Sequence, residues 1–474
     1  MNTAAIDTYV EAQMRRLKIP GAALAIVEGA RVTYRRGYGR AHPGGDAPGP
    51  ETPFALGSTT KSFTALAVMQ LAEAGRIELD APVRRYLPWF RVADPQASAR
   101  MTVRHLLNQT SGMSMVAGTA CLADLDDSPE AREGQARGLS TLELNHAVGE
   151  SFQYCNLNYN VLGLVIEAVS EQSYADYVQD HISAPLDMSR THASLDRAER
   201  DGLATGHRYW FGMPVPATGL PFPRGPLAAG GLVSTAEDLT HYVVAQLSGG
   251  RYDGPDGSTQ ILSSAGIEEM HREVAEQRFL GSTVATYGMG WFVSEVGGTT
   301  LVSHGGNVPD FSSFIGLLPE RKKGVVLLTN SDHGLPMILT EVGEGLAALV
   351  AGREPPPIRF GFFPWTMRAL PLAPLLQGAG AMATLRSLDR WNREPVFRPS
   401  GGRLWGRQIL LPLAPNLAPA ALLVLLRRRG LLPYLRLYMP DLAWLLTICG
   451  GFAALWSVAS TVLKLLSSRR GARV

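Results

Sequence analysis

The sequence predicts an α/β fold in which helices flank one antiparallel sheet, a helical insertion interrupts it, and transmembrane helices follow at the C-terminus. Three observations predict this class: strand patterns at both ends of residues 1–352, helical periodicity between them, and long uncharged stretches in the rear. Strands from distant segments can complete one sheet while the intervening segment packs alongside. We therefore expect one domain over residues 1–352, a linker over 353–368, and a membrane region over 369–474 with two or three transmembrane helices.

The first expected elements are a helix and a hairpin. Apolar residues recur at helical spacing from Ile6 to Leu17, and Pro20-Gly21 ends that pattern. The next stretch, AALAIVEGARVTYRRGYG, has the pattern of two strands that meet at Glu28-Gly29. These two strands are expected to join strands from the far end of the domain.

The far end supplies two more hairpins. YGMGWFVSEVGGTTLVSHGG predicts a hairpin that turns at Gly297-Gly298, and SSFIGLLPERKKGVVLLTN predicts the second. A helical pattern from Leu339 to Leu349 closes the domain. Between the two sets of strands, the segment from Phe54 to about Leu247 predicts a mostly helical insertion.

The stretch GSTTKS lies at the start of this insertion. A phosphate-binding loop requires Gly directly before the Lys, and Thr60 occupies that position, so a nucleotide site is excluded. The helical pattern from Ser62 to Gly75 places Ser58 at a helix N-terminus and Lys61 one turn later on the same face. S-x-x-K is typical of acyl-transferring serine enzymes. The structural alternative is that Ser58 caps the helix and Lys61 lies on its surface.

Acyl chemistry also requires a second proton carrier and donors for the oxyanion. Tyr154 and Asn156 precede an apolar helix, and His304-Gly305-Gly306 ends an apolar strand. Each has a structural alternative: Asn156 as a helix cap, Tyr154 as a core aromatic, and His304 as a turn residue. Cys155 is a further candidate nucleophile, and the three cysteines do not indicate a disulfide framework.

In this order, Ser58-Thr59-Thr60-Lys61, Tyr154-Cys155-Asn156 and His304-Gly305-Gly306 resemble the S-x-x-K, Y-x-N and H-x-G motifs of the beta-lactamase and penicillin-binding-protein-like serine hydrolases. The similarity is closest to the branch of class C beta-lactamases, D-alanyl-D-alanine carboxypeptidases and related esterases, and it covers about residues 4–350. It implies a beta-lactamase/transpeptidase-like fold and a covalent acyl-enzyme formed on an ester, amide or peptide-like small molecule. We expect no cofactor and no metal, because no H-E-x-x-H occurs and the histidines are scattered.

The resemblance implies a role for each catalytic residue. Ser58 would attack the carbonyl, and Lys61 and Tyr154 would share the role of base. Either pKa could be lowered for this purpose, the Lys by burial and the Tyr by a nearby ammonium. Tyr154 would also protonate the leaving group.

The resemblance likewise implies the substrate-binding residues. Asn156 would orient the substrate amide and Lys61, and His304 takes the place of the Lys in the K-T-G form of the third motif. The oxyanion would be held by the backbone N–H groups of Ser58 and of Asn307, which follows Gly306. Relatives commonly carry Thr or Ser where this chain has Gly305, so we expect weak action on carboxylate-bearing substrates and better action on uncharged esters or amides.

The charge distribution argues against a nucleic-acid partner. Residues 356–474 carry sixteen Arg or Lys against three Asp or Glu, a net charge of +13, so the remainder must carry 2 − 13 = −11. The basic residues interrupt apolar runs instead of lining one polar face, which is not the pattern of a nucleic-acid-binding protein.

The same rear segment predicts a membrane partner. Leu442 to Leu463 is 22 residues without a charge and is followed by Lys464, Arg469 and Arg470; Ile409–Leu426 and Ala369–Leu385 are weaker candidate spans. With three spans, positive-inside counting leaves the front domain outside the cytoplasm of a bacterial cell.

Two questions stay open at this level. The first 21 residues do not have the pattern of a signal peptide, which leaves either an upstream start or a cytoplasmic front domain. The alternative function is a membrane-anchored protein that binds or senses beta-lactams or cell-wall peptides with little turnover.

Overall fold

The computed structural model describes residues 2–217, 219–279, 282–335, 337–394, 396 and 403–469. The chain divides into two compact units, one of Met1–Tyr209 with Pro214–Gly361 and one of Trp210–Met213 with Phe362–Val474. The first unit contains all of the expected catalytic residues, and each unit is described separately below.

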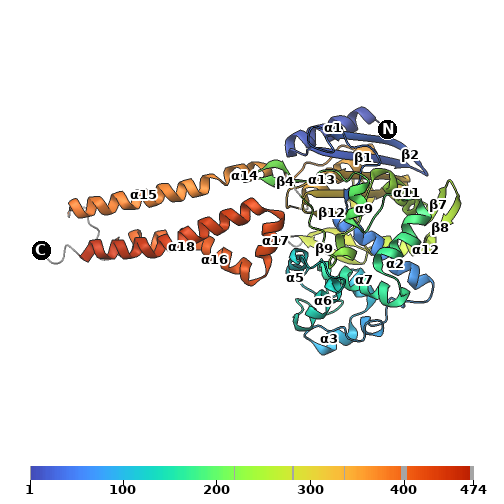
Figure 1. The fold of residues 1–474 in the computed structure, drawn as a ribbon, viewed down its shortest axis with the longest axis horizontal. Coiled ribbons are helices and arrows are strands. Elements are labelled where there is room, and N and C mark those ends of the chain that lie inside the picture. The colour runs from blue at the N-terminus through green and yellow to red at the C-terminus, as the bar shows by residue number, and fades with distance from the viewer. Residues whose placement is uncertain are drawn as a thin grey trace. The chain divides into compact units, whose positions relative to one another are not determined.

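The first unit is built on an antiparallel eight-stranded sheet (Figure 1). Its strand order is β2 (Arg31–Gly39), β1 (Gly21–Glu28), β14 (Lys323–Thr329), β13 (Phe311–Leu318), β12 (Thr299–Val308), β11 (Phe292–Val296), β10 (Ser282–Tyr287) and β9 (Ala275–Phe279). The predicted hairpins are confirmed, and β1 pairs with β14, which joins the two ends of the domain in one sheet. The hairpin of β9 and β10 was not predicted, because these strands are short and mostly polar.

Helices cover both faces of this sheet. On one face α13 (Met337–Val350) packs so closely on β13 that a Cβ at Gly343 would lie 2.2 Å from the Phe314 ring, and α1 (Thr3–Leu17) contacts α13. On the other face α11 (Ala236–Leu247) brings Val243 against Gly324 of β14. The second face also receives the helical insertion, so the main core lies between the sheet and the insertion.

The insertion is mostly helical, as predicted. Its elements are η1 (Gly57–Thr59), α2 (Thr60–Glu73), η2 (Val83–Arg85), α3 (Pro95–Arg100), α4 (Val103–Leu107), α5 (Met115–Ala120), η3 (Cys121–Ala123), α6 (Ala131–Gly138), η4 (Leu139–Thr141), α7 (Asn156–Ser170), α8 (Tyr174–Val178), η5 (Gln179–Ser183), η6 (Ala184–Leu186), α9 (Leu195–Arg200) and α10 (Leu227–Gly230). Short strands accompany them: β3 (Phe54–Ala55) with β6 (Val233–Ser234), and β15 (Ser331–Asp332) with β4 (His207–Trp210) and β5 (Met213–Pro216). The strands β7 (Arg251–Gly254) and β8 (Gly257–Gln260) and the helix α12 (Ser264–His271) follow α11.

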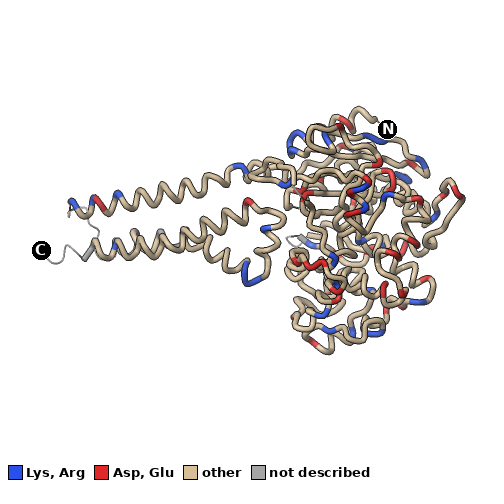
Figure 2. The backbone as a smooth tube through the Cα atoms, viewed as in Figure 1, with Lys and Arg blue, Asp and Glu red and all other residues tan. Residues whose placement is uncertain are grey.

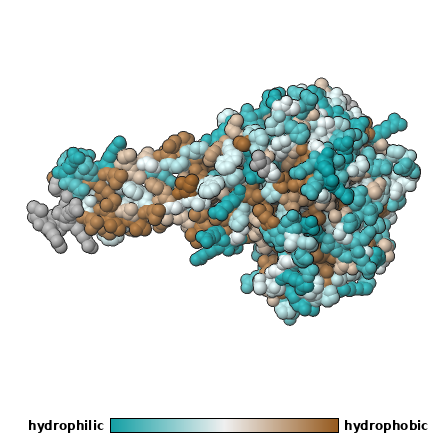
Figure 3. All heavy atoms as spheres, viewed as in Figure 1, coloured by the Kyte–Doolittle hydropathy of each residue, from teal (hydrophilic) through white to brown (hydrophobic). Residues whose placement is uncertain are grey.

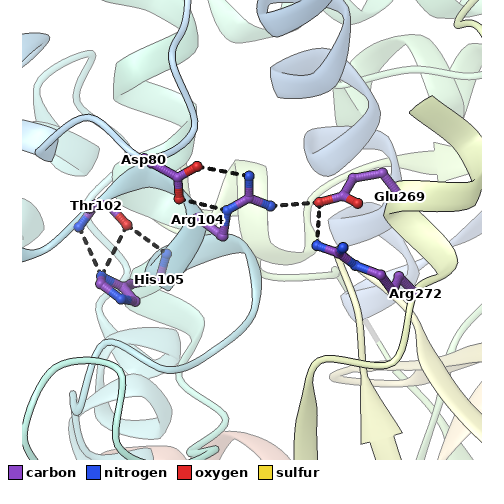
Figure 4. A network of polar contacts seen from close by, with 6 residues as sticks. All are labelled: Asp80, Thr102, Arg104, His105, Glu269 and Arg272. Atoms are coloured by element: carbon purple, nitrogen blue, oxygen red, sulfur yellow. Dashed lines mark hydrogen bonds and ion pairs between the residues drawn. The ribbon is translucent and has the colours of Figure 1, made fainter. Parts of the chain in front are cut away.

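A charged network attaches the insertion to α12 (Figure 4). The Arg104 guanidinium on α4 donates two hydrogen bonds to Asp80, at 2.7 and 3.0 Å, and one to Glu269 on α12 at 2.6 Å. Arg104 keeps the pKa of Asp80 below its ordinary value through this hydrogen bonding. Because α4 also contacts α7, the network helps to fix the helix that begins at the candidate site.

The second unit is a set of helices: α14 (Phe363–Ala369), α15 (Leu372–Arg393), the π-helix η9 (Arg403–Leu410), α16 (Leu411–Arg428), α17 (Leu431–Tyr438) and α18 (Pro440–Arg469). Apolar residues cover much of their length, with charged residues gathered near helix ends (Figures 2 and 3). Among the described residues one helix, over Pro440–Ser467, is long and apolar enough to cross a membrane, and only 28% of its apolar window is buried.

The prediction of two or three transmembrane helices is therefore wrong for this part of the chain. The candidate span at Ile409–Leu426 contains Pro412, Pro415, Asn416 and Pro419, and its helix ends in arginines. The candidate at Ala369–Leu385 is short, and α15 continues past it into Arg386, Asp389, Arg390 and Arg393. Prolines and charges lower the mean hydropathy of both helices below that of α18. Arg470 lies outside the described residues.

Candidate active site

The three motifs meet at the end of β12. Ser58 lies in η1, Lys61 in the first turn of α2, Tyr154 and Asn156 at the start of α7, and His304 in β12. The register of β12 with β11 stops at Ser303, whereas its pairing with β13 continues to Val308. The last residues of β12 therefore have β13 on one side and η1, which carries the half-buried Ser58, on the other.

Lys61 is the centre of the hydrogen bonding in this site. Its Nζ lies 3.0 Å from Ser58 Oγ, 2.8 Å from Asn156 Oδ1 and 2.6 Å from the backbone oxygen of Ala229. Lys61 is fully buried, and burial lowers its pKa to about 7. It is not a surface residue of the helix, so that structural alternative is wrong.

The partners of Lys61 determine what its amine can do. The oxygens of Asn156 and Ala229 are acceptors only, so they take two N–H groups. A neutral amine has two such hydrogens and one lone pair, and the lone pair is then left for the hydroxyl of Ser58. A charged Lys61 would donate its third N–H to Ser58 instead, so the same contacts hold both forms, and the neutral form can accept the proton of Ser58.

Asn156 is held so that its side-chain oxygen faces Lys61. Its Nδ2 donates to the backbone oxygen of Gly118 at 2.8 Å, so its Oδ1 faces Lys61. The cap position of α7 is occupied by Cys155, without a side-chain capping bond. Ser58 likewise makes no capping bond to the helix. The capping alternatives for Ser58 and Asn156 are therefore wrong.

Tyr154 contacts both Lys61 and Ser58, and its share in the role of base stays a prediction. Its ring lies beneath Lys61, with Nζ 5.0 Å from the ring centroid, and it stacks on Phe292. Burial raises the pKa of Tyr154 well above its ordinary value, although a hydrogen bond with Ser58 acts in the opposite direction. A phenol in this state is protonated at neutral pH, so we expect it to pass a proton on instead of taking the first proton from Ser58.

His304 is a buried strand residue and not a turn residue. Its side chain is 2% exposed, its Nδ1 lies 2.7 Å from the backbone oxygen of Gly305, and its Nε2 lies 3.4 Å from the hydroxyl of Tyr287. Burial, with a smaller contribution from Lys61, lowers the pKa of His304 to about 3. The imidazole is therefore neutral where the K-T-G form would have a permanent cation.

Two glycines allow β12 to approach the nucleophile. Gly57 has φ +57°, and a Cβ there would lie 2.5 Å from the backbone nitrogen of Asn307. A Cβ at Gly306 would lie 1.9 Å from the oxygen of Leu56. Both glycines are required by this contact, because any side chain would push the strand away from Ser58. The backbone amide of Asn307 thus lies against the residue before the nucleophile.

Gly305 points away from the site. A Cβ at this position would lie 2.4 Å from Oγ1 of Thr340 on α13, which covers the opposite face of the sheet. Residues alternate between faces along a strand, so Gly305 faces α13 when its neighbours face η1. A hydroxyl-bearing side chain at position 305 would therefore face α13 and not the site, so its absence does not weaken carboxylate binding as we expected.

The site also contains groups that the sequence did not single out. The backbone oxygens of Gly118 and Ala229 hold Asn156 and Lys61. Tyr287 and Phe292 pack against Tyr154 and His304, and Phe152 packs against Tyr287 and Phe292. Backbone acceptors have no sequence signature. The aromatic residues could have been suspected only from their nearness in sequence to the Y-x-N and H-x-G motifs.

A metal centre and a cysteine nucleophile have less support in the described part of the chain. No group of three His, Cys, Asp or Glu side chains there could hold a metal ion. Cys155 is fully buried and burial raises its pKa to about 11, so it is a poor candidate nucleophile at neutral pH.

Comparison with known proteins gives consistent matches that cover most of the chain. A family model described as Beta-lactamase matches residues 6–349. "Protein flp" of Staphylococcus aureus (strain MW2) is 32% identical over 332 residues, which are 69% of this chain and 62% of the relative. "Penicillin-binding protein 4" of Amycolatopsis lactamdurans is 30% identical over 349 residues, 71% of this chain and 87% of the relative. The match thus spans less than two thirds of the length of the flp protein.

Solved structures agree on the fold. The octameric penicillin-binding protein homologue from Pyrococcus abyssi matches with a TM-score of 0.66 and 30% identity, over 78% of this chain and 81% of that one. EstCE1, a hydrolase with promiscuous acyltransferase activity, matches with a TM-score of 0.59 and 24% identity, over 70% of this chain and 94% of that one. At that identity the second likeness concerns the fold alone.

Proposed function

Because the chain belongs to the beta-lactamase family, we propose that it is a serine hydrolase that forms a covalent acyl-enzyme on Ser58. The observation that carries this proposal is the position of Lys61, whose amine lies between two obligate acceptors and the Ser58 hydroxyl. Burial brings the pKa of Lys61 to about 7, so much of the amine is neutral at physiological pH. A general base is most effective when its pKa is near the working pH.

In the acylation step, Ser58 Oγ attacks the substrate carbonyl as its proton moves to Lys61 Nζ. The developing oxyanion is held by the backbone N–H groups of Ser58 and Asn307, and the close contact between Gly57 and Asn307 supports this pairing. Tyr154 then gives its proton to the leaving alcohol or amine and recovers one from Lys61. Its raised pKa supports this role, because the phenol is protonated when the leaving group departs.

In the deacylation step, water takes the place of the leaving group and attacks the acyl carbonyl. Its proton passes to Tyr154 as Tyr154 gives its own proton to Lys61, and Lys61 then returns a proton to Ser58 Oγ. The same base and oxyanion donors serve both steps, so the Ser58 ester is hydrolysed and the enzyme is regenerated. Slow water attack would instead leave a stable adduct, which is the behaviour of the alternative, a binding or sensing protein.

The proposed substrates are esters or amides without a carboxylate beside the reacting carbonyl. His304 supports this preference, because a buried neutral imidazole offers no permanent charge to a carboxylate. Hydrogen bonds to charged groups are stronger than those between neutral groups, so a site without this cation loses affinity chiefly for anions.

We also propose that α18 anchors the protein in a membrane. Its 28 apolar-rich residues from Pro440 to Ser467 would extend about 42 Å as a helix, more than the ~30 Å hydrocarbon core. Leu455 and Val458 are 76% and 67% exposed, which favours a lipid-facing helix over a core helix. Basic residues lie on both sides of α18, so positive-inside counting does not support one orientation, and an extracytoplasmic catalytic domain stays a prediction.

The nucleophile can be tested by covalent labelling of the full chain with a fluorescent fluorophosphonate. We expect the wild type to be labelled and Ser58→Ala to lose the label completely. Ser62→Ala is the matched control, because Ser62 lies in α2, four residues after Ser58, and donates to the oxygen of Thr59. It should label like the wild type. Equal labelling of Ser58→Ala would contradict the proposal, and a wild-type adduct that never turns over would favour the binding protein.

The substrate preference can be tested with His304→Lys, which introduces a flexible cation. We expect the ratio of kcat/KM for benzylpenicillin to kcat/KM for an uncharged p-nitrophenyl ester to rise about tenfold. His304→Gln, which stays neutral, is the control and should leave the ratio near the wild-type value. A wild type that already prefers benzylpenicillin over the ester would overturn the proposed preference.

Anchoring can be tested by alkaline carbonate extraction of membranes that contain the full chain. An integral helix should keep the protein in the membrane pellet, because carbonate removes only proteins bound by charge. A variant with Leu455 and Val458 both replaced by Arg should be released, because a charge at mid-bilayer costs about 2.5–3.5 kcal/mol per residue. Release of the wild type would rule out a transmembrane anchor.

A further inference from the structure

A buried carboxylate lies beside the oxyanion end of β12. Asp332 ends the short strand β15 and is 3% exposed. The side-chain Nδ2 of Asn307 donates to Asp332 Oδ1 at 2.8 Å and to Ser312 Oγ at 2.9 Å. A side-chain amide has two N–H hydrogens, so both are used within the protein. Asn307 can therefore contribute to the site through its backbone, while its side chain acts as an anchor.

The hydrogen bond between Asn307 and Asp332 is one of several that hold the turn of the β12–β13 hairpin in place. Val308 pairs with Phe311, which leaves a tight turn containing Asp310 at φ 72°. The Arg208 guanidinium donates to both oxygens of Asp310, at 2.8 and 2.6 Å. Arg208 and Asp332 are partners in the parallel pairing of β4 and β15. The short strands β4 and β15 thus hold the β12–β13 hairpin at two points, at Asp310 in its turn and at Asn307 in β12.

The position of Asp332 is costly for the fold. Its carboxyl is buried, and burial raises the pKa of Asp332 to about 7, although hydrogen bonds with Asn307 and the backbone of Gly334 act in the opposite direction. Burying a carboxylate is destabilising even when it accepts hydrogen bonds, so its position needs a reason beyond packing. Its bond to Asn307 supplies that reason, because Asn307 carries a proposed oxyanion donor.

We propose that Asp332 is a positioning residue for the oxyanion hole, acting through the side chain of Asn307. By holding Nδ2, it fixes the end of β12 against Gly57 and aims the Asn307 backbone N–H at the carbonyl attacked by Ser58. This inference rests on the proposed acyl-enzyme function, because it assigns Asp332 a part in the same reaction. Asp332 does not touch the substrate.

The test is a double-variant cycle in the full chain with Asp332→Ala and Asn307→Ala. Asn307→Ala keeps the backbone N–H and removes only the anchor. We expect each variant to lower kcat for a p-nitrophenyl ester, and the affinity for phenylboronic acid, by about tenfold. The boronate reports on the oxyanion hole, because it bonds to the serine and presents an oxygen there. KM should change less than twofold.

The effects of Asp332→Ala and Asn307→Ala on kcat and on boronate affinity should not be additive. If Asp332 acts through Asn307, the double variant should also be about tenfold impaired, because either single change already breaks the contact. A loss near a hundredfold, or wild-type boronate affinity in Asp332→Ala, would overturn the inference. Asp332→Asn keeps an acceptor oxygen and should restore the wild-type values if Asp332→Ala folds poorly.

A second readout separates this inference from the proposed function. Amide hydrogen exchange over residues 304–310 should be faster in Asp332→Ala than in the wild type, and unchanged over β1 and β14. Wild-type protein that reacts neither with the ester nor with the boronate would refute the function. Unchanged exchange over 304–310 in a reactive enzyme would refute the role of Asp332 alone.

Discussion

The structure of the site depends on the placement of one buried amine. Lys61 receives its hydrogen-bond partners from three elements: η1 gives Ser58, α7 gives Asn156 and α10 gives Ala229. A charged ammonium is expensive to bury, so burial favours the neutral form and brings the pKa to about 7. Because burial lowers the pKa of Lys61, its amine can act as a base near neutral pH for as long as the three elements keep their positions.

The rest of the domain can be understood as support for this arrangement. The sheet joins strands from both ends of the chain, and β12 extends past β11 to present its free edge to η1. Gly57 and Gly306 permit that contact, and α13 fills the far face of the strand. Burial lowers the pKa of Lys61 and raises that of Tyr154. These opposite shifts give the two neighbours different roles, since the amine can accept a proton at a pH where the phenol is still protonated.

The sequence predicted the hairpins, the insertion and the position of the serine–lysine pair, because these follow from periodicity, turns and spacing along the chain. It did not predict β9 and β10, whose strands are short and polar. It also missed the acceptor on Ala229 and the anchor at Asp332, because a backbone oxygen has no signature and Asp332 lies 25 residues after Asn307. The face of the sheet on which Gly305 lies depends on the strand register, and the spacing of motifs along the sequence does not reveal that register.

The most direct test of the central claim is the pH dependence of Ser58 acylation, followed as the second-order rate of fluorophosphonate labelling from pH 5 to pH 10. Lys61 must be neutral to accept the proton, so the rate should rise with pH and reach half its plateau near pH 7, where its pKa lies. A rate that rises only near pH 10 would mean that Lys61 keeps the pKa of an ordinary lysine. That result would contradict its role as the base.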